Sequence, residues 1–327
     1  MIMSMNHTWR GTLGWAMPIF FLTLGVATVS RAAAPTEKSN DGTVRIVFGG
    51  DVMLDGGPGH ALAHEEDPFA DVAPLLRSAD IAVCNLECVV ARHGTHMLKP
   101  YTFKARPACI AVLQQHFAAV CVANNHAGDY GPDGLLEELV LLEKGSLPYF
   151  GGGRDKKESH RPLILERNGR RIALLGYNDF PPRTFEAGDH RAGTAWLTPA
   201  EVIADIKAAR TVNHADLVIP MLHWGEELEP SPQYSQKALA RSLIDAGADA
   251  VIGGHPHVSQ TVDIYKGRPI VYSLGNFVFD YFPGDPLIWT GWLVRLTFSK
   301  TAVPELETFV VELDRSGIPH LIPKPDK

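Results

Sequence analysis

The chain has 327 residues, of which 45% are hydrophobic and 20% are charged, a balance typical of a globular protein with a sizeable core. Its formal net charge is -7, and the sequence contains no run of basic residues. Nucleic-acid binding needs clustered Lys and Arg against phosphate, so we expect no nucleic-acid partner.

The first 35 residues differ from the rest of the chain. His7 and Arg10 precede an uncharged stretch from Gly11 to Ser30, and small residues follow. This order is typical of a secretory signal peptide, and the stretch is also near the lower length limit for a membrane span. We expect residues 1–35 to be a signal peptide or N-terminal membrane anchor and residues 36–327 to be exported, either periplasmic or extracellular. A buried N-terminal helix is the alternative.

In the first half of the remaining chain, apolar runs of strand length alternate with helical patterns. The sequence predicts strands over 44–48, 79–84 and 118–122. Asp67-Pro68 predicts a helix start, with Asp as cap and Pro at the first helical position. Further helices are predicted from near Pro107 and over 134–144, the latter closed by Gly145.

The second half repeats this order. Strands are predicted over 171–176, 217–222 and 250–252, and residues 261–311 are predicted to be mainly strand with a hairpin turn at Lys266-Gly267. Thr198-Pro199 with Glu201 predicts a capping box that opens a helix to about Arg210. Another helix is predicted over 235–246. This alternation predicts a single α/β domain with parallel or mixed sheets covered on both faces.

Four cysteines follow the N-terminal segment: Cys84, Cys88, Cys109 and Cys121. No pair has the C-x-x-C spacing of a zinc or redox motif. Cys84 and Cys121 fall in apolar runs, so we expect buried free thiols. A Cys88–Cys109 disulfide stays open, because an exported chain enters an oxidising compartment.

Five predicted strands end in residues that bind metals or carry protons. In chain order these are Asp51, Asn85 with Glu87, Asn125 with His126, His223, and His255 with His257. In open α/β sheets, ligands bind beyond the carboxyl ends of the strands, so we expect these side chains to converge. Imidazole and carboxylate together suit Zn, Mn or Fe, and a bridging carboxylate suits two ions. We therefore predict one or two divalent ions.

Each motif alone has a structural alternative. Asp51 after a strand is typical of a turn cap, Glu87 of a solvated strand end, and His223 of a satisfied core histidine. Gly254-His255-Pro256-His257 is the strongest single signal, because its proline holds two imidazoles on a stiff turn. The prediction of a metal site rests on the joint occurrence of the motifs at strand ends.

Six motifs together resemble the CapA family, which is associated with synthesis of poly-gamma-glutamate capsule. They are residues 49–54, 85–87, 124–126 with Asp129-Tyr130-Gly131, 223–226, 254–257 and 272–277. The resemblance runs from about Val44 to about Asp280. The family is similar to the calcineurin-like metallophosphatases, which implies two mixed β-sheets sandwiched together and flanked by helices.

The resemblance also implies residue roles. Asp51 matches a ligand from the first strand, Glu87 the bridging carboxylate, and Asn125 a ligand of the second ion. His126 matches an acid near the leaving group. His223, His255 and His257 complete the metal-ligand set.

The chain departs from the phosphatase pattern at two motifs. The phosphatases have Asp-x-His where this chain has Asp51-Val52-Met53, and Gly-Asp-x-x-Asp where it has Asn85-Leu86-Glu87. One metal position has therefore lost a histidine ligand. Asp55 is a candidate replacement, and an ordinary loop aspartate is the alternative reading.

Charged residues near the motifs have open roles. Glu226 and Glu227 follow His223 closely enough to handle protons, with a solvated loop as the alternative. We name Glu226 as a catalytic candidate with His126. Lys99, Lys104 and Arg106 are candidates to receive phosphate or glutamate carboxylates, and a solvated face is the stronger reading for them.

The functional expectation is an exported, metal-binding protein in the synthesis, transfer or export of poly-gamma-glutamate or a related cell-envelope polymer. Its expected partners are that polymer, or another phosphorylated or carboxylated substrate, and proteins of a membrane synthase. Two alternatives stay open. One is a metal-dependent phosphoesterase of the same compartment, and the other is a non-catalytic scaffold of a synthase complex.

Overall fold

The computed structural model describes residues 41–280, 286–300 and 303–323. The expected signal or anchor segment, residues 1–35, lies outside this part. Within the described residues, no helix is both long and apolar enough to cross a membrane.

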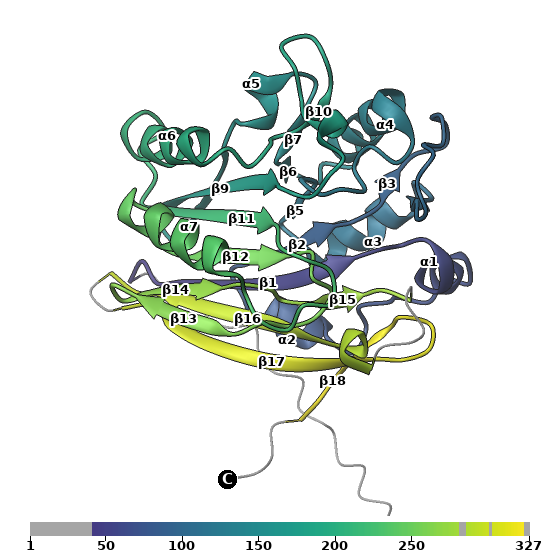
Figure 1. The fold of residues 1–327 in the computed structure, drawn as a ribbon. Helices are drawn as coiled ribbons and strands as arrows, with labels where there is room; N and C mark the ends of the chain where they lie inside the picture. Colours follow the sequence, from purple (N-terminus) through teal and green to yellow (C-terminus); the bar gives the residue numbers. More distant parts are fainter. Residues whose placement is uncertain (1–40, 281–285, 301–302, 324–327) are drawn as a thin grey trace, which may run out of the picture. The chain divides into compact units, whose positions relative to one another are not determined.

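A mixed sheet of eight strands forms one half of the described fold (Figure 1). Its strands lie in the order β18-β17-β16-β1-β2-β5-β6, with β15 also paired to β1. β1 is parallel to β2 and β15 and antiparallel to β16. The bounds are β1 Val44–Val52, β2 Ile81–Leu86, β5 Ala119–Cys121, β6 Tyr149–Phe150, β15 Asn276–Val278, β16 Thr290–Phe298, β17 Glu305–Leu313 and β18 Pro319–Leu321.

A second mixed sheet has six strands in the order β13-β14-β12-β11-β9-β8. β11 at its centre is parallel to β9 and β12. The bounds are β8 Leu163–Arg167, β9 Arg170–Asn178, β11 Leu217–His223, β12 Val251–Gly254, β13 Val262–Tyr265 and β14 Arg268–Val271. Two short pairs lie outside both sheets, formed by β3 Val89–Val90 with β4 Lys104–Ala105 and by β7 Gly152–Gly153 with β10 Gly193–Thr194.

Helices cover the outer faces of the two sheets. The bounds are α1 Gly56–Ala63, α2 Ala73–Arg77, α3 Cys109–His116, α4 Gly131–Lys144, α5 Lys156–Ser159, η1 Arg183–Phe185, α6 Pro199–Thr211, α7 Tyr234–Asp245 and η2 Pro286–Trp289. Figure 1 shows α6 and α7 against the sheet that contains β9, β11 and β12.

Alternation along β1 explains how the layers pack. Ile46 and Phe48 belong to the same apolar cluster as Ile219 of the second sheet, whereas Val47 belongs to the cluster that contains residues of α2, α3 and α4. Successive side chains of a strand face opposite sides, so a fully apolar strand buries both faces. A third cluster joins α6 and α7 to the second sheet. The predicted α/β architecture of two mixed sheets flanked by helices, the metallophosphatase-like fold, is confirmed.

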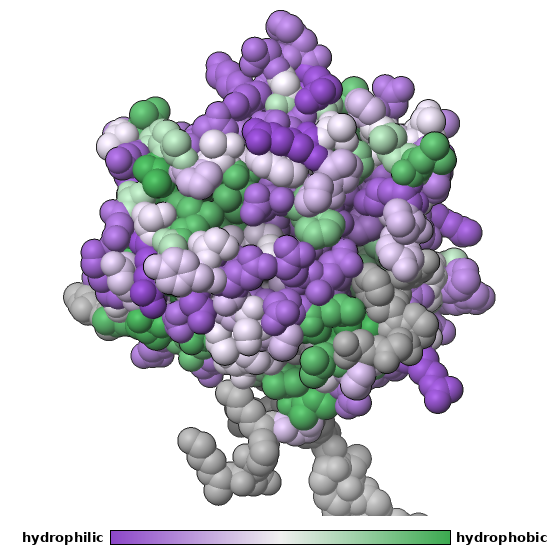
Figure 2. Space-filling view, viewed as in Figure 1, coloured by the Kyte–Doolittle hydropathy of each residue, from purple (hydrophilic) through white to green (hydrophobic). Residues whose placement is uncertain are grey.

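The face in Figure 2 is mainly polar, with apolar side chains in separate patches. Ile264 on β13, Leu287 on η2 and Val310 on β17 are among the exposed large apolar residues. Scattered apolar exposure of this kind is normal for a folded domain.

Several local predictions were wrong. Asp67 caps no helix, since α2 begins only at Ala73, and its carboxylate instead accepts the Phe69 N–H and pairs with His116. α6 begins at Pro199 as predicted, but the Thr198 side chain makes no capping hydrogen bond. The capping box belongs to α7 and is formed by Gln233 and Gln236.

The bounds of one further helix differ from expectation, whereas the expectation of buried free thiols is confirmed. α4 starts at Gly131, three residues before the predicted start, and Gly145 at its end has ordinary right-handed geometry. All four cysteines are buried free thiols, and no disulfide joins Cys88 to Cys109.

Glu138 on the buried face of α4 gives a testable prediction for stability. Burial raises the pKa of its carboxyl well above the usual value, so the folded chain holds it neutral, whereas the unfolded chain ionises it above about pH 4.3. A raised folded pKa means that stability is lost as pH rises above the unfolded pKa. We expect Glu138→Gln to remove this loss, so that its stability advantage grows by up to about 1.4 kcal/mol per pH unit. Urea unfolding from pH 5 to pH 8 measures it.

Glu143→Gln, at an exposed position of the same helix, is the control, because its partner Arg154 stays charged throughout this pH range. It should show no advantage that grows with pH. A constant difference between Glu138→Gln and the wild type across this range would contradict the prediction.

Candidate metal centre

Strand register brings three polar residues of the first sheet together. Asp51, near the end of β1, pairs across the ladder with Asn85 of β2 on one side and Asn276 of β15 on the other. Glu87 follows β2 directly, and its N–H donates to Val52 O at 2.8 Å. Asp51 and Glu87 are both fully buried. Two carboxylates are therefore fixed at one edge of the sheet.

The second sheet supplies three imidazoles at the same edge. His223 ends β11 and lies opposite Gly254, which ends β12, and His255 and His257 follow. His255 and His257 have positive φ angles, 96° and 59°. Such strain in residues other than glycine costs about 1–3 kcal/mol and persists where the surroundings impose it. A Cβ at Gly254 would lie 2.8 Å from Asp51 Oδ1, so this close approach requires glycine.

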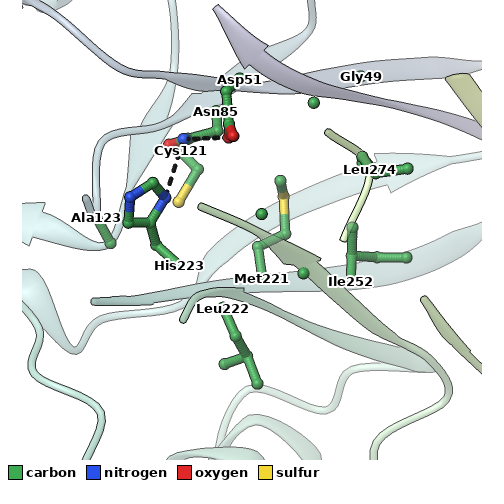
Figure 3. A pocket seen from close by; sticks show the side chains of 13 residues that line it. Gly49, Asp51, Asn85, Cys121, Ala123, Met221, Leu222, His223, Ile252 and Leu274 are labelled. Atoms are coloured by element: carbon green, nitrogen blue, oxygen red, sulfur yellow. Dashed lines mark hydrogen bonds between the residues drawn. The ribbon is translucent and has the colours of Figure 1, made fainter. Parts of the chain in front are cut away.

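A chain of amides orients Asp51 and His223. The His126 N–H donates to Asn124 Oδ1, and Asn124 Nδ2 donates to Asn85 Oδ1 at 3.0 Å. Asn85 Nδ2 therefore faces the site, donating to Asp51 Oδ1 at 2.8 Å and lying 3.3 Å from His223 Nδ1 (Figure 3). Asn85 stands in one of the motifs that depart from the phosphatase pattern. It orients Asp51 on the first sheet and His223 on the second.

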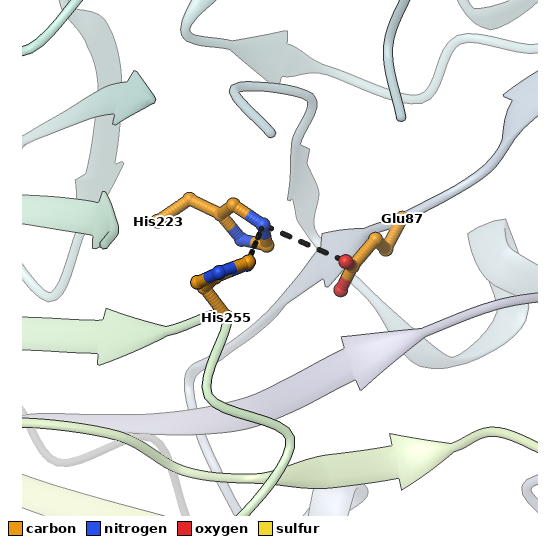
Figure 4. A group of neighbouring side chains, drawn as sticks. All are labelled: Glu87, His223 and His255. Carbon is orange, nitrogen blue, oxygen red and sulfur yellow. Dashed lines mark hydrogen bonds and ion pairs between the residues drawn. The ribbon is translucent and has the colours of Figure 1, made fainter. Parts of the chain in front are cut away.

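Two groups of potential ligand atoms share Glu87. In the first, Glu87 Oε1 lies 3.5 Å from His223 Nε2, which is 3.1 Å from His255 Nδ1 (Figure 4). In the second, His257 Nδ1 lies 3.7 Å from Asp51 Oδ2, and His257 Nε2 lies 3.8 Å from Glu87 Oε1. Within each group, the ligand atoms all lie within 4.8 Å of one another. Two ligands of a tetrahedral zinc ion lie about 3.3 Å apart, so these separations suit a cation.

The residues fit a divalent cation on two further grounds. Glu87 Oε1 and His255 Nε2 are buried atoms without a hydrogen-bond partner in the described structure. Burial raises the pKa of Asp51, against the effect of His257, and burial together with Asp51 raises the pKa of Glu87 well above its usual value. Burying two carboxylates side by side is costly unless a cation compensates them.

Burial also lowers the pKa of His223 and His255 well below the usual value, and the neighbouring imidazoles add to this effect. Neutral imidazole is the form that binds metals. The histidines are therefore already in the protonation state that a cation needs.

His126 and Asn125 lie at the mouth of this cluster. Asn125 Oδ1 is 2.7 Å from His223 Nε2. His126 Nδ1 is 2.7 Å from Asp129 Oδ2, and its Nε2 is 4.0 Å from Glu87 Oε1. Burial lowers the pKa of His126 to about 4, although Asp129 opposes this. The lowered pKa favours the neutral ring at pH 7, and we assign its proton to Nδ1, where Asp129 accepts it, so that Nε2 faces Glu87.

Lys99, a candidate anion-binding residue, and Asp129, for which no role of its own was expected from the sequence, both contact the residues at the mouth of the cluster. Lys99 Nζ lies 2.6 Å from Asp129 Oδ1 and donates to Asn125 O at 2.9 Å, and its side chain is only 18% exposed. Asp129 Oδ2 also accepts the Phe103 N–H. The solvated-face reading of Lys99 was wrong, because Asp129 ties the loop that carries it to His126.

Other candidates lie elsewhere. Asp55 caps α1 and accepts the Lys104 N–H, so its carboxylate is occupied outside the cluster. Glu226 is exposed, whereas Glu227 lines the cleft described next. Lys104 and Arg106 line a separate cavity beside α1.

A cleft of about 250 Å³ opens beside the cluster. It is lined by Lys99, Pro100, Tyr101, Phe103, Asn125, His126, Phe180, Pro181, Pro182, Glu227 and His257. A second space, beneath Asp51 and between the sheets, measures only about 10 Å³ and is lined mainly by apolar residues such as Met221, Ile252 and Leu274 (Figure 3). It has room for one water at most, so of these two spaces only the larger cleft can admit a ligand.

The comparisons with known proteins agree with these motifs. The family model described as "Bacterial capsule synthesis protein PGA_cap" matches residues 45–281. The chain belongs to this capsule synthesis family. The match contains every residue of the two ligand groups, as well as the cleft.

Two curated CapA proteins illustrate the relationship. The "PGA biosynthesis protein CapA" of Bacillus subtilis (strain 168) is 32% identical over 274 residues, which cover 81% of this chain and 71% of that protein. The "Capsule biosynthesis protein CapA" of Bacillus anthracis is 32% identical over 277 residues, covering 81% and 67%. A hypothetical protein from Thermus thermophilus shares the fold, with a TM-score of 0.52, 18% identity and coverage of 82% of this chain and 99% of that one.

Proposed function

We propose that this CapA-family chain is an exported, metal-dependent protein that acts in the synthesis, transfer or export of poly-gamma-glutamate or a related envelope polymer. The printed names of its relatives refer to PGA and capsule biosynthesis, which supports the polymer. The observation that carries metal dependence is the pair of buried ligand groups that share Glu87. Export rests on the composition of residues 1–35, and membrane synthase proteins are the proposed partners.

Different residues would bind the ions and exchange protons. Asp51, Glu87, His223, His255 and His257 would hold one or two ions of Mn, Zn or Fe, with Asn125 as a further oxygen ligand. A bound cation would supply Lewis-acid polarisation of a carbonyl or phosphoryl oxygen. His126 lies between the cluster and the cleft, and its Nε2 is available to exchange a proton with the reacting group. Asp129 fixes the orientation of its ring.

A metal-dependent phosphoesterase is the second candidate, favoured by the sharing of Glu87. Two ions that share a carboxylate clamp both oxygens of an in-line phosphoryl transfer. Met53 occupies the place of a phosphatase histidine, and its Sδ accepts the Asp55 N–H at 3.1 Å. This difference favours one strong and one weak ion position. It also leaves room for the scaffold reading, in which the site binds but does not react.

Polymer production in the host bacterium tests the proposal. We expect deletion of the gene to lower the amount or change the length of envelope polyglutamate, and the wild-type chain to restore it. The double variant His255→Ala, His257→Ala should fail to restore it at equal protein level, because both ligand groups lose an imidazole. Exposed His64→Ala is the control and should restore fully.

Each failure has a separate meaning. Full restoration by the double variant would leave the scaffold reading and remove metal dependence. An unchanged polymer in the deletion strain, together with phosphate-ester turnover by the purified chain, would favour the phosphoesterase.

A further inference from the structure

The cleft beside the metal centre carries opposite charges on its walls. Lys99 and Glu227 both line it, one from the loop after β3 and the other from the loop after β11. Phe180, Pro181 and Pro182 form an apolar wall of the same cleft. A ligand that fits these walls has both an anionic and a cationic group.

Lys99 has one donor left for such a ligand. Its ammonium has three N–H groups, of which one faces Asp129 Oδ1 at 2.6 Å and another donates to Asn125 O at 2.9 Å. His126 Nδ1 is 3.4 Å away, but its own proton is directed to Asp129. The ammonium also lies near the His126 ring and the Phe185 ring, whose centroid is 5.6 Å away, and an anion is a stronger partner for the third N–H than either ring. The two fixed contacts orient the ammonium in advance.

Glu227 supplies the matching negative charge. It is exposed, and among the described residues no cation pairs with it. A phosphate dianion, or a carboxylate with no ammonium beside it, would be repelled by Glu227, whereas a carboxylate next to an ammonium would satisfy both walls. An α-amino acid end group has this pattern.

We propose that the cleft binds the amino-terminal residue of a γ-linked glutamate chain, with its α-carboxylate on Lys99 and its α-ammonium on Glu227. This deepens the proposed function and rests on it for the polymer. In a γ-linked chain only the amino-terminal residue keeps a free α-amino group beside a free α-carboxylate. An α-linked chain has no such pair, because the α-carboxylate of that residue forms the peptide bond. The cleft would therefore recognise both the end and the linkage.

Binding of three defined probes tests this. They are a γ-linked glutamate pentamer with a free amino end, the same pentamer N-acetylated, and an α-linked pentamer. Calorimetry on the full chain, before and after chelation of metal, should show the free γ-linked pentamer binding at least about tenfold more tightly than the other two. Glu227→Gln should reduce its affinity to that of the acetylated probe. Lys99→Met should weaken both γ-linked probes, and Lys99→Arg should weaken them less.

Two neighbouring variants are matched controls. Glu229→Gln changes another exposed carboxylate of the same loop, and Lys104→Met changes a lysine that lines the separate cavity beside α1. Both should keep the wild-type preference. Melting temperatures of the variants show that each is folded.

Equal binding of the free and acetylated pentamers, or no binding of any pentamer, would overturn the proposal. So would a loss of preference in the controls as large as in Glu227→Gln. The chelated arm separates the two levels of inference. If the free γ-linked pentamer is preferred but the protein shows neither bound metal nor turnover, the subsite is supported and the catalytic function is contradicted. If the protein binds metal but does not prefer that pentamer, only the subsite is contradicted.

Discussion

Replacing Glu87 by glutamine is expected to lower metal affinity by at least about 100-fold and to raise the melting temperature of the metal-free protein. Glu87 is the residue common to both ligand groups, so one change weakens both. Loss of a residue that merely orients a metal ligand costs about 10–100-fold, and a shared ligand should cost more. Titration of the metal-free protein with metal, followed by calorimetry, measures the metal affinity.

The stability gain has a separate cause. Glu87 is fully buried beside Asp51, and both effects raise its pKa. In the absence of metal, folding at neutral pH must therefore take up a proton that the unfolded chain lacks, which costs stability. Glutamine keeps the shape and still accepts from Asn85, which lies 3.3 Å from Glu87 Oε2. A gain of about 1 kcal/mol would raise the melting temperature by about 2–4 °C. Glu226→Gln at the surface should change neither quantity, and a Glu87→Gln protein with wild-type affinity would contradict the two-group site.

The second large effect is expected for His126→Ala, which should lower turnover by about 10²- to 10⁴-fold while metal content stays at the wild-type value. His126 faces the cleft and is held by Asp129, but it belongs to neither ligand group. Turnover of γ-linked glutamate oligomers, or of a chromogenic phosphate ester, measures the loss. Metal content measured on the same sample separates proton transfer from metal binding.

Exposed His64→Ala is the control for this change and should keep full turnover. If His126→Ala lost its metal together with its activity, the ring would have to be a ligand. Unchanged turnover would remove it from the chemistry altogether.

The convergence of the site could be predicted because it follows from strand chemistry. Long apolar runs locate strands that are buried on both faces, and the carboxyl ends of parallel strands share one edge. Asp51, Glu87 and His223 were placed at such ends from the sequence alone, and the structure brings them together. No long-range information beyond the order of strands and helices was needed.

What the sequence could not supply depends on tertiary contacts. Lys99 lies in a loop without regular structure, and its direction is set by Asp129, about thirty residues later in the chain. α1 begins Gly56-Gly57-Pro58-Gly59, which is typical of a loop. It forms because Asp55 caps it and Asp280 accepts the Gly57 N–H. Asp55 directly precedes the helix, but Asp280 is 223 residues from Gly57 in the sequence, so a local pattern cannot reveal that contact.

The central claim is that the shared-carboxylate cluster holds metal. Elemental analysis of the full chain, purified and then incubated with Mn, Zn or Fe and desalted, tests it most directly. We predict one or two equivalents of a divalent ion in the wild type and close to none in the His255→Ala, His257→Ala variant, with both proteins folded by circular dichroism. A wild type without metal under all three conditions, or a double variant that retains the full amount, would contradict the claim.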